Sequence, residues 1–410
     1  MILDMSYTLA MFRQRQLDQA LESRSLDGFF DQVISVHPLA GLFDPGTDRY
    51  GDPIVTQLDE AHTFVEGRVG MASWMRAVPP LNFVAAQVRL VRLLVSLARR
   101  GRISLVRAGD PYYLGLLGWL LARLLRVPLA VRVPFRYDEI RRITGRAVMP
   151  RLFRFGWIEK RIERFVFARC DLIAGANEDN MRYGIENGGR PDVATVFRYG
   201  NLLHQAHWMD PAARPNAEED LAALGLSGRR FTVTVSRLEP MKRVEDVVRV
   251  AGDLLRRGHD VCSLIVGEGS LQEPLEAQVR SAGLEGRVVF AGNRNQEWIA
   301  RVLPHGAAIV SPHMGRGLVE AALGAVPLVA YDYDWQREIV IDGETGYLVD
   351  NGDWRVMAER VEQLLMRPET ARAMGLSARA MAFDMMDPQR LMDHEQATYA
   401  RLIEQWPTIR

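Results

Sequence analysis

Residues Ser311 to Pro327 read SPHMGRGLVEAALGAVP, and this stretch decides the fold that we expect. The apolar run from Ala307 to Ser311 just before it predicts a buried parallel strand, and the apolar residues from Leu318 onward recur at helical spacing. A strand, a glycine loop and a helix therefore follow one another. Glycine lets a backbone approach a ligand, and the first amides of a helix carry partial positive charge. The stretch is a candidate site for a phosphorylated ligand.

Six residues of this stretch are candidates for ligand contacts: His313, Gly315, Arg316, Gly317, Leu318 and Glu320. A carboxylate at Glu320 cannot bind phosphates, but it can accept hydrogen bonds from sugar hydroxyls, as acidic residues do for ribose in dinucleotide sites. The alternative is an ordinary strand-loop-helix corner with a solvated glutamate.

A second stretch, Phe231 to Arg243 (FTVTVSRLEPMKR), supports the phosphate hypothesis. Phe231 to Ser236 alternates as a buried strand, and the loop after it carries Arg237 and Lys242 before a helix expected near Val244. Arginine binds an oxyanion bidentately and lysine acts as a compact point charge. Two such cations beside a glycine loop indicate a diphosphate clamp.

Four pieces of the C-terminal half occur in a distinctive order: Ser236-Arg237-Leu238 with Lys242-Arg243, Val266-Gly267-Glu268-Gly269, Ser311 to Glu320, and Asp342-Gly343-Glu344-Thr345-Gly346-Tyr347-Leu348-Val349. In this order the chain resembles the retaining nucleotide-sugar glycosyltransferases of family four, also called glycosyl transferases group 1. The resemblance covers about Arg230 to Trp406, and the first two hundred residues match only in pattern. It implies an α/β GT-B fold, with two Rossmann-like doubly wound parallel-sheet domains facing a cleft.

The resemblance also implies a function, the transfer of a sugar from a nucleotide-diphosphate donor such as a UDP- or GDP-sugar, with retention. Arg237 and Lys242 would stabilise the departing diphosphate, and Gly267, Glu268 and Gly269 would contact the nucleotide. We expect no cofactor and no metal, because the two cations do the neutralising. The expected acceptor is a lipid-linked or polysaccharide glycan.

Two departures from the family pattern leave alternatives open. Pro312 stands where relatives carry a first glutamate, and Val133-Pro134 stands where a donor-binding histidine is expected. One alternative is a sugar-nucleotide epimerase or hydrolase on the same scaffold. The other is a catalytically degenerate protein that binds nucleotide or a partner, although a chain released from binding diphosphate has no physical need of Arg237, Lys242 and Glu320.

The chain has 410 residues, of which 48% are hydrophobic and 25% charged, as in a globular protein of two domains. We expect an N-terminal acceptor-binding domain at 1–205 and a nucleotide-sugar-binding domain at 206–385. A C-terminal helix at 386–410 is expected to return to the first domain. The polar, proline-containing stretch from Leu202 to Arg229 predicts the linker.

Residues 1–200 alternate predicted strands and helices, which indicates a parallel sheet covered on both faces. The strands are expected at Asp31–His37, Ile103–Val106, Leu129–Val133 and Leu172–Ala174, and the helices at Phe83–Arg100, Pro111–Arg126 and Met149–Arg169. Ligands of such sheets bind beyond the carboxyl ends of the strands. The acceptor-side candidates there are Asp110, Arg136, Tyr137 and Asp138.

The formal net charge is zero, but its distribution is uneven. Residues 1–200 hold 28 Lys and Arg against 21 Asp and Glu, and residues 89–169 alone hold 19 against 5. The expected helix at Met149–Arg169 is basic and amphipathic and carries Trp157, so peripheral contact with an anionic membrane through 89–169 is one hypothesis. The alternative is a sheet-packing helix with a solvated basic face. No recognition motif accompanies the charge, so we expect no nucleic acid partner.

The two cysteines, Cys170 and Cys262, have no metal or redox spacing, which suits a reducing compartment. The first residues lack the pattern of a secretion signal. Arg123 and Arg126 interrupt the apolar segment Leu114–Val131, which predicts a helix and a strand rather than a membrane span. We therefore expect a cytoplasmic protein at the inner face of the cell membrane.

Overall fold

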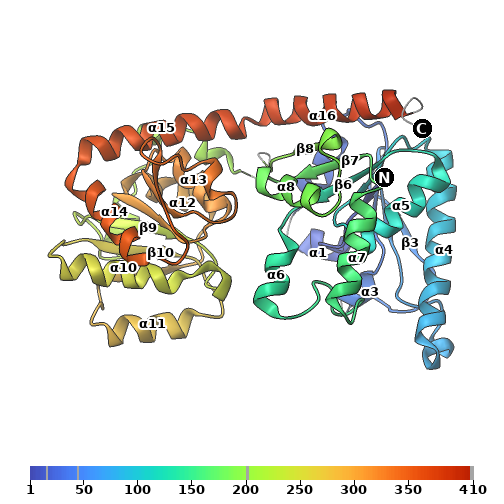
Figure 1. The fold of residues 1–410 in the computed structure, drawn as a ribbon, viewed down its shortest axis with the longest axis horizontal. Coiled ribbons are helices and arrows are strands. Elements are labelled where there is room, and N and C mark those ends of the chain that lie inside the picture. Colours follow the sequence, from blue (N-terminus) through green and yellow to red (C-terminus); the bar gives the residue numbers. More distant parts are fainter. Residues whose placement is uncertain (15–16, 44–45, 200–202, 407–410) are drawn as a thin grey trace. The chain divides into compact units, whose positions relative to one another are not determined.

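The computed structural model describes residues 1–14, 17–43, 46–199 and 203–406, and these form two compact units (Figure 1). Unit 1 comprises Met1–Arg198 with Gln389–Arg410, and unit 2 comprises Tyr199–Pro388. The chain thus leaves unit 1 once and comes back to it at the end. The boundaries fall after Arg198 and after Pro388, whereas residues 205 and 385 were expected from the sequence.

Unit 1 contains an eight-stranded sheet among its described residues, in the order β3-β4-β2-β1-β5-β6-β7-β8. Its strands are β1 (Ile2–Leu3), β2 (Val33–His37), β3 (Ile54–Gln57), β4 (His62–Glu66), β5 (Val106–Ala108), β6 (Leu129–Val133), β7 (Leu172–Gly175) and β8 (Ala194–Val196). Every pairing is parallel except that of β3 with β4. All side chains of β2, β6 and β7 are buried, as expected of strands covered on both faces.

The helices of unit 1 are α1 (Leu9–Gln14), α2 (Asp18–Glu22), α3 (Ala40–Phe43), α4 (Pro79–Arg100), α5 (Tyr113–Leu125), α6 (Tyr137–Thr144), α7 (Gly156–Phe167), α8 (Glu178–Glu186) and α16 (Pro388–Gln405). Helix α5 packs on β5 and β6, with α4 and α7 against its sides. Two glycines make this packing close. A Cβ at Gly118 would stand 2.9 Å from Leu129, and one at Gly115 would stand 2.8 Å from Val166.

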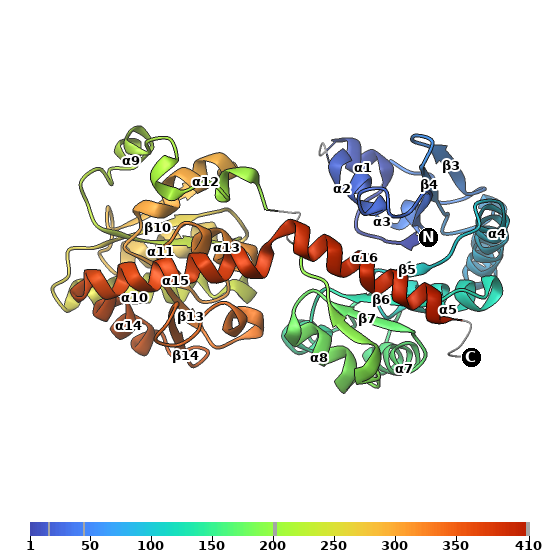
Figure 2. The same ribbon diagram turned by 90° about the horizontal axis from the view of Figure 1, so that it is seen from above.

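Helix α16 is attached to unit 1 by specific contacts (Figure 2). Gln396 Nε2 donates to Leu26 O at 2.8 Å, and Trp406 Nε1 donates to Arg126 O at 3.1 Å. Tyr399 is fully buried and lies edge-on to Phe197, with ring centroids 5.3 Å apart. The last helix is therefore part of the core of unit 1.

Unit 2 contains a six-stranded parallel sheet in the order β11-β10-β9-β12-β13-β14 among its described residues. Its strands are β9 (Phe231–Val235), β10 (Cys262–Val266), β11 (Val288–Gly292), β12 (Ala308–Ser311), β13 (Leu328–Tyr331) and β14 (Gly346–Val349). Alternate residues belong to different cores, because side chains of a strand point to opposite faces. Leu328 and Ala330 join one cluster, and Val329 and Tyr331 join the other.

The helices of unit 2 are α9 (Glu218–Ala223), α10 (Val244–Arg256), α11 (Gln272–Ser281), α12 (Gln296–Val302), α13 (Arg316–Leu323), α14 (Trp354–Met366) and α15 (Pro368–Met386). Helices α10, α11 and α14 share one hydrophobic cluster, and α12, α13 and α15 share the other. The six-stranded sheet is thus covered on both faces.

Two predictions about the bounds of helices and strands were wrong. The helix expected at Met149–Arg169 begins only at Gly156. The amides of Val148 and Met149 donate instead to the buried carboxylate of Glu159, at 2.8 and 2.7 Å, which holds the preceding segment as a turn. The strand expected from Ile103 begins at Val106, because Arg102 has a φ of 48° and turns the chain.

The stretch predicted as the linker falls within unit 2. Leu202 lies outside the described residues, but Arg214 is buried and donates to the carbonyls of His207, Ala300 and Leu323 at 2.7 to 3.0 Å. These bonds fasten the stretch to unit 2. The strands at β1, β3, β4, β8 and β14 were not anticipated.

Candidate functional site

Four loops of unit 2 meet at one edge of its sheet. They follow β9, β10, β12 and β13, which are adjacent and parallel, so that their carboxyl ends lie side by side. Ligands of open α/β sheets bind at this edge. Arg237 and Lys242 lie after β9, Gly267 to Gly269 after β10, and His313 to Glu320 after β12. The fold thus brings together all the donor-side candidates.

Lys242 lies against the glycine loop. A Cβ built on Gly315 would stand 3.8 Å from Lys242 Nζ, and Gly315 is the residue from which α13 begins. Arg237 is exposed on the same loop as Lys242. Among the residues that the structure describes, no carboxylate forms an ion pair with either cation. Two unneutralised cations therefore lie near the amino end of a helix, which is an arrangement that attracts an anion.

The backbone of the loop requires glycine. Gly315 has φ 71° and ψ −137°, a conformation essentially closed to other residues. A Cβ on Gly317 would stand 2.9 Å from Val235 O, so that any larger residue would push α13 away from β9. Both glycines therefore keep the start of α13 close to the carboxyl end of β9.

The loop after β10 is closed against the loop after β9. Leu238 N donates to Glu268 O at 3.0 Å, and Cβ atoms on Gly267 or Gly269 would collide with the carbonyls of Ser236 and Leu238. The Glu268 side chain is exposed, and its Oε1 accepts from Asn293 N at 3.2 Å. This loop thus presents an exposed carboxylate at the carboxyl end of β10.

Residues after β13 fix the loop after β12, and the sequence analysis missed them. Gln336 is fully buried, accepts from Ser311 Oγ at 2.5 Å and donates to Pro312 O at 3.1 Å. His313 contacts Asp334 Oδ2 through Nε2 at 3.1 Å and Met241 O through Nδ1 at 3.2 Å. The imidazole thus bridges two loops and orders the site.

Asp332 and Asp334 have an Asp-x-Asp spacing that the sequence analysis overlooked. Asp332 forms a bidentate pair with Arg337 at 2.7 and 2.6 Å, and Asp334 contacts His313. Both carboxylates are therefore engaged in the structure of the loops.

Glu320 and Leu318 differ in what they offer a ligand. Glu320 is 2% exposed and accepts from Arg316 Nε at 2.9 Å. Leu318 was expected to contact the donor, but its side chain is fully buried in the core and its amide donates to Gly315 O at 3.0 Å. Its side chain therefore faces the sheet, and a contact of Leu318 with the donor stays a prediction for its backbone alone.

Burial changes the charge equilibria of the site. Burial and, to a smaller extent, the nearby charge of Arg237 lower the pKa of Lys242 to about 8, while Asp334 opposes the shift. Burial also raises the pKa of Glu320, against the influence of Arg316. An incoming diphosphate would favour the charged form of Lys242.

In unit 1, three of the four acceptor-side candidates are held by neighbours. Arg136 pairs with Asp179 and Glu186, both at 2.9 Å, and Asp138 pairs with Arg141 and Lys160, both at 2.5 Å. Tyr137 is 4% exposed and belongs to the core. Its side chain packs inward from the first turn of α6, so a contact of Tyr137 with an acceptor stays a prediction.

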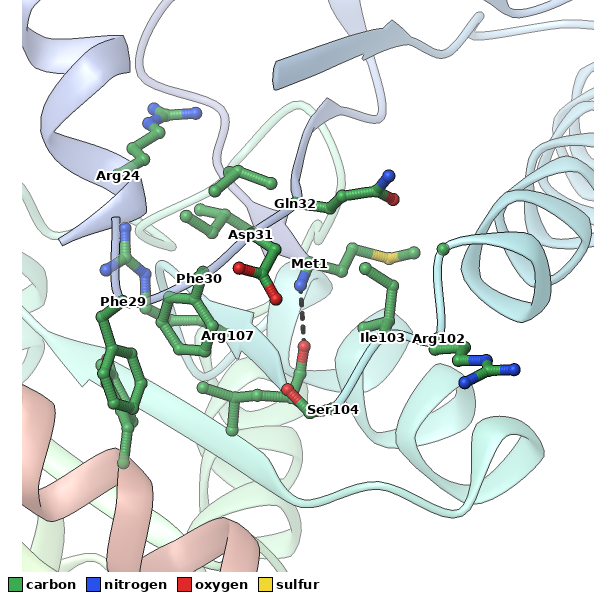
Figure 3. Close-up of a pocket in the computed structure, with 15 residues that line it drawn as sticks. Met1, Arg24, Phe29, Phe30, Asp31, Gln32, Arg102, Ile103, Ser104 and Arg107 are labelled. Carbon is green, nitrogen blue, oxygen red and sulfur yellow. Dashed lines mark hydrogen bonds between the residues drawn. The ribbon is translucent and has the colours of Figure 1, made fainter. Parts of the chain in front are cut away.

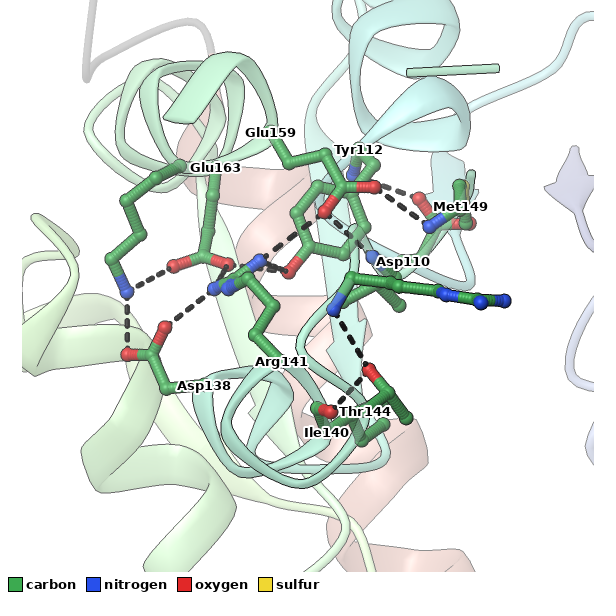
Figure 4. Close-up of polar contacts among 12 residues, drawn as sticks. Asp110, Tyr112, Asp138, Ile140, Arg141, Thr144, Met149, Glu159 and Glu163 are labelled. Carbon is green, nitrogen blue, oxygen red and sulfur yellow. Dashed lines mark hydrogen bonds and ion pairs between the residues drawn. The ribbon is translucent and has the colours of Figure 1, made fainter. Parts of the chain in front are cut away.

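Asp138 is the outer member of a buried network (Figure 4). Glu163 is fully buried and accepts from Tyr112 and Tyr183 hydroxyls at 2.6 and 2.8 Å, and it pairs with Arg141 at 3.0 Å. The network joins α5, α6, α7 and α8, and it is structural. Asp110 lies beside it, and burial raises the pKa of Asp110 to about 7, although the amide of Tyr112 donates to its carboxylate at 2.7 Å.

A separate cavity of about 150 Å³ in unit 1 lies between Met1, Asp31 and Ile103 (Figure 3). Each of these residues comes just before a strand, β1, β2 or β5, so the cavity lies at the amino ends of the strands. Ligands of parallel sheets bind at the opposite edge. We therefore do not assign the donor or acceptor to it.

Two α/β units with parallel sheets, one of them carrying a cationic glycine-loop site at its carboxyl edge, define a protein of the GT-B class. Comparison with solved structures agrees with this fold. The structure of Anabaena Alr3699/HepE in complex with UDP superposes with a TM-score of 0.71 and 18% identity, over 98% of this chain and 99% of that one.

Sequence comparison gives the family. Residues 216–381 match the family model described as "Glycosyl transferases group 1". Alpha-D-kanosaminyltransferase of Streptomyces kanamyceticus is 32% identical over 63% of this chain and 67% of its own length. A GDP-mannose-dependent alpha-(1-6)-phosphatidylinositol monomannoside mannosyltransferase of Mycolicibacterium smegmatis is 33% identical, over 43% of this chain and 48% of that protein. The chain belongs to the glycosyl transferases group 1, and it matches about half to two thirds of the length of these relatives.

Proposed function

We propose that the protein transfers a sugar from a nucleoside-diphosphate-sugar donor to a lipid-linked or polysaccharide glycan, with retention of the anomeric configuration. The observation that carries the proposal is the placement of Lys242 Nζ beside Gly315 at the start of α13, with Arg237 close by and neither cation paired to a described carboxylate. This arrangement suits a diphosphate better than a neutral ligand.

The chemistry follows from the charges. When the bond between the sugar and the diphosphate breaks, the anomeric carbon becomes oxocarbenium-like and negative charge accumulates on the leaving oxygen. Lys242 and Arg237 stabilise that charge, and one preorganised group of this kind is worth on the order of a hundredfold in rate. Glu320 accepts hydrogen bonds from donor hydroxyls once Arg316 turns away. The two cations do the neutralising, so we propose that no metal is needed.

The acceptor is proposed from the relatives and from charge. The Mycolicibacterium relative is named for a phosphatidylinositol-linked acceptor and GDP-mannose. Unit 1 is the basic part of this chain, with 19 Lys and Arg against 5 Asp and Glu over residues 89–169. An anionic or lipid-linked glycan is complementary to it. We place the protein in the cytoplasm at the inner face of the cell membrane, which agrees with two free, buried cysteines.

The proposal is tested first with the nucleotides. UDP, GDP and ADP are added singly to the wild type and to Lys242→Ala and Glu320→Ala, and thermal stability is measured. A nucleotide at about a hundred times its dissociation constant stabilises a protein by about 2.7 kcal/mol. One nucleotide should stabilise the wild type, and the Lys242 variant should lose the effect. Stabilisation by none of them would favour a degenerate, non-catalytic protein.

The reaction itself is tested with the matching nucleotide-sugar. Release of nucleoside diphosphate should accelerate when a glycan acceptor is supplied, in the presence of a chelator as well as without it, and the product should keep the anomeric configuration of the donor by NMR. If the donor is consumed at a rate that no acceptor changes, the protein is a hydrolase or an epimerase instead.

A further inference from the structure

The exposed face of α4 is unusually apolar. Outside the core, five large apolar side chains gather on α4 and on the 3-10 turn just before it, Ser73–Ala77. They are Trp74 (77% exposed), Val78 (45%), Leu81 (63%), Val84 (56%) and Val88 (42%). Leu81, Val84 and Val88 are spaced by three and four residues, so they form one stripe on the helix. We call these five side chains the α4 apolar face.

The opposite side of α4 is fixed to unit 1. Ala86, Leu90, Leu94 and Ala98 are buried under the helix. Asn82 is also buried, and its Oδ1 accepts from the amides of Met71 and Ala72 at 2.6 and 3.0 Å. These bonds hold the turn that presents Trp74. The α4 apolar face is therefore displayed by a rigid support, with β3 beside it in both views (Figures 1 and 2).

Arginines continue the same stripe toward the end of α4. Arg92 and Arg99 follow Leu81 by 11 and 18 residues, which at 100° per residue returns to the same side of the helix. Together with Arg76 and Arg100 they are exposed, and none of these four forms an ion pair with a described residue. Residues 67–109 contain eight arginines and no Asp, Glu or Lys. The stripe is thus apolar in its first half and cationic in its second.

We propose that this surface docks on a membrane that contains anionic lipids. Apolar side chains enter the interface while arginines contact lipid phosphates, and tryptophan favours the headgroup level. Helix α4 is long and apolar enough to cross a membrane, with a hydropathy of 1.5 over its most apolar window. It lies on the surface instead, because its inner side packs on the sheet and Arg89 and Arg92 interrupt its middle.

Charge also decides against a second copy of the chain as the occupant. A two-fold interface places the same surface on both partners. Such an interface would gather the arginines of both copies, without an acidic residue from Gly67 to Gly109 to neutralise them. The basic segment around α7 exposes fewer large apolar side chains, Phe155 and Trp157, and its Lys160 is paired with Asp138 and Glu163. The proposed contact therefore moves from 89–169 to α4 and the turn before it, which overlap that segment only over residues 89–100.

This inference deepens the proposed function and rests on it. Docking on the membrane has a role in catalysis because it brings the enzyme to a lipid-linked acceptor. The docking itself is measured without donor or acceptor, by co-sedimentation of the full chain with vesicles. Vesicles of phosphatidylcholine alone are compared with vesicles of equal parts phosphatidylcholine and phosphatidylglycerol. The wild type should sediment with the mixed vesicles, less so at high salt, and remain in solution with phosphatidylcholine alone.

Two variants test the residues. Leu81→Ser with Val84→Ser removes apolar contacts, and Arg92→Glu with Arg99→Glu reverses two charges. Each should weaken partitioning on the order of tenfold or more. Leu376→Ser and Arg372→Glu are matched controls, since both residues are exposed on α15 in unit 2, and they should bind as the wild type does. Thermal unfolding checks that each variant is folded.

The outcomes separate docking from catalysis. The docking proposal is overturned if the wild type does not sediment with the mixed vesicles. It is equally overturned if the α4 variants sediment with them to the same extent as the controls. It is also overturned if light scattering finds a dimer that Leu81→Ser with Val84→Ser dissociates, because a second copy then covers this face. Nucleotide stabilisation is measured on the same preparations, so that a failure of the proposed donor site is seen independently.

Discussion

Arg316 and Glu320 are paired within the first turns of α13, with Arg316 Nε donating to Glu320 Oε1 at 2.9 Å. The carboxylate is 2% exposed, whereas the guanidinium is about half exposed. A buried carboxylate is stable only with partners. The arginine therefore satisfies Glu320 as long as no sugar hydroxyls do.

Arg316→Ala should destabilise the protein by about 1–3 kcal/mol, because it leaves a buried carboxylate without this partner. Glu320→Gln removes that charge, so the double variant should lose less stability than the sum of the two single variants. Urea and thermal unfolding of the three variants measure the coupling. Simple additivity would mean that the pair contributes nothing.

Lys242→Met should lower kcat/KM on the order of a hundredfold or more, because it removes the charge that meets the leaving diphosphate. Methionine keeps the length of the side chain, so the fold should persist. Arg372→Met removes an exposed cation from α15 and serves as the control. Initial rates at varied donor concentration give kcat/KM for each variant. An unchanged kcat/KM for Lys242→Met would exclude Lys242 from the donor site.

Nucleotide binding and protein stability should respond to pH in opposite directions. Burial lowers the pKa of Lys242 to about 8, from 10.5. Above about pH 8 the lysine loses its proton, so the affinity for the nucleoside diphosphate should fall.

Over the same interval, between about 8 and 10.5, the unfolded chain binds more protons than the folded one, and the stability contributed by this group rises with pH. Titration calorimetry and thermal unfolding measure the two trends. Lys242→Met should abolish both, and equal pH profiles for variant and wild type would refute the assignment.

Gly315→Ala should cost about 1–3 kcal/mol of stability and weaken nucleotide binding, because φ 71° with ψ −137° is strained for any residue with a Cβ. Gly258→Ala is the matched control. Gly258 also has a positive φ, 89°, but a Cβ there meets open space. It should lose stability and keep nucleotide-dependent stabilisation at full size. If both variants bind nucleotide normally, the loop before α13 is not part of the site.

Glu163→Gln should destabilise the chain by about 3 kcal/mol or more, since it removes the buried charge that pairs with both Arg141 and Lys160. Asp52→Asn breaks an exposed pair with Arg89 and should change stability by less than about 1 kcal/mol. Chemical denaturation compares the two. Similar small effects would show that the network of Figure 4 does not stabilise unit 1.

The strands of the sheets could be predicted where their sequence alternates or is continuously apolar. Those expected at Phe231–Ser236 and Ala307–Ser311 were placed within a residue of the observed ends of β9 and β12, because strand periodicity is local. The start of α7 at Gly156 could not be predicted from local sequence. The amides of Val148 and Met149 donate to the carboxylate of Glu159, which lies about ten residues further along the chain.

The candidate site was predicted in part for the same reason. Arg237, Lys242 and the glycines follow predicted strands directly, so a parallel sheet brings them to one edge. Gln336 and Asp334 were missed, because they order Ser311 and His313 only through contacts across more than twenty residues. The spacing of Leu318 in the sequence did not reveal that its side chain faces the sheet.

By itself the sequence determined the class of fold, the family motifs and the cations of the site, since these depend on residue types at short, fixed spacings. Only the tertiary structure decided which of those groups remain unpaired. Lys242 and Arg237 keep their charge unneutralised, whereas Arg136 and Asp138 are paired with neighbours. The tertiary structure also decided that Trp74 and Leu81 face outward. Pairing and exposure depend on partners distant along the chain, and only folding brings those partners within a few ångströms.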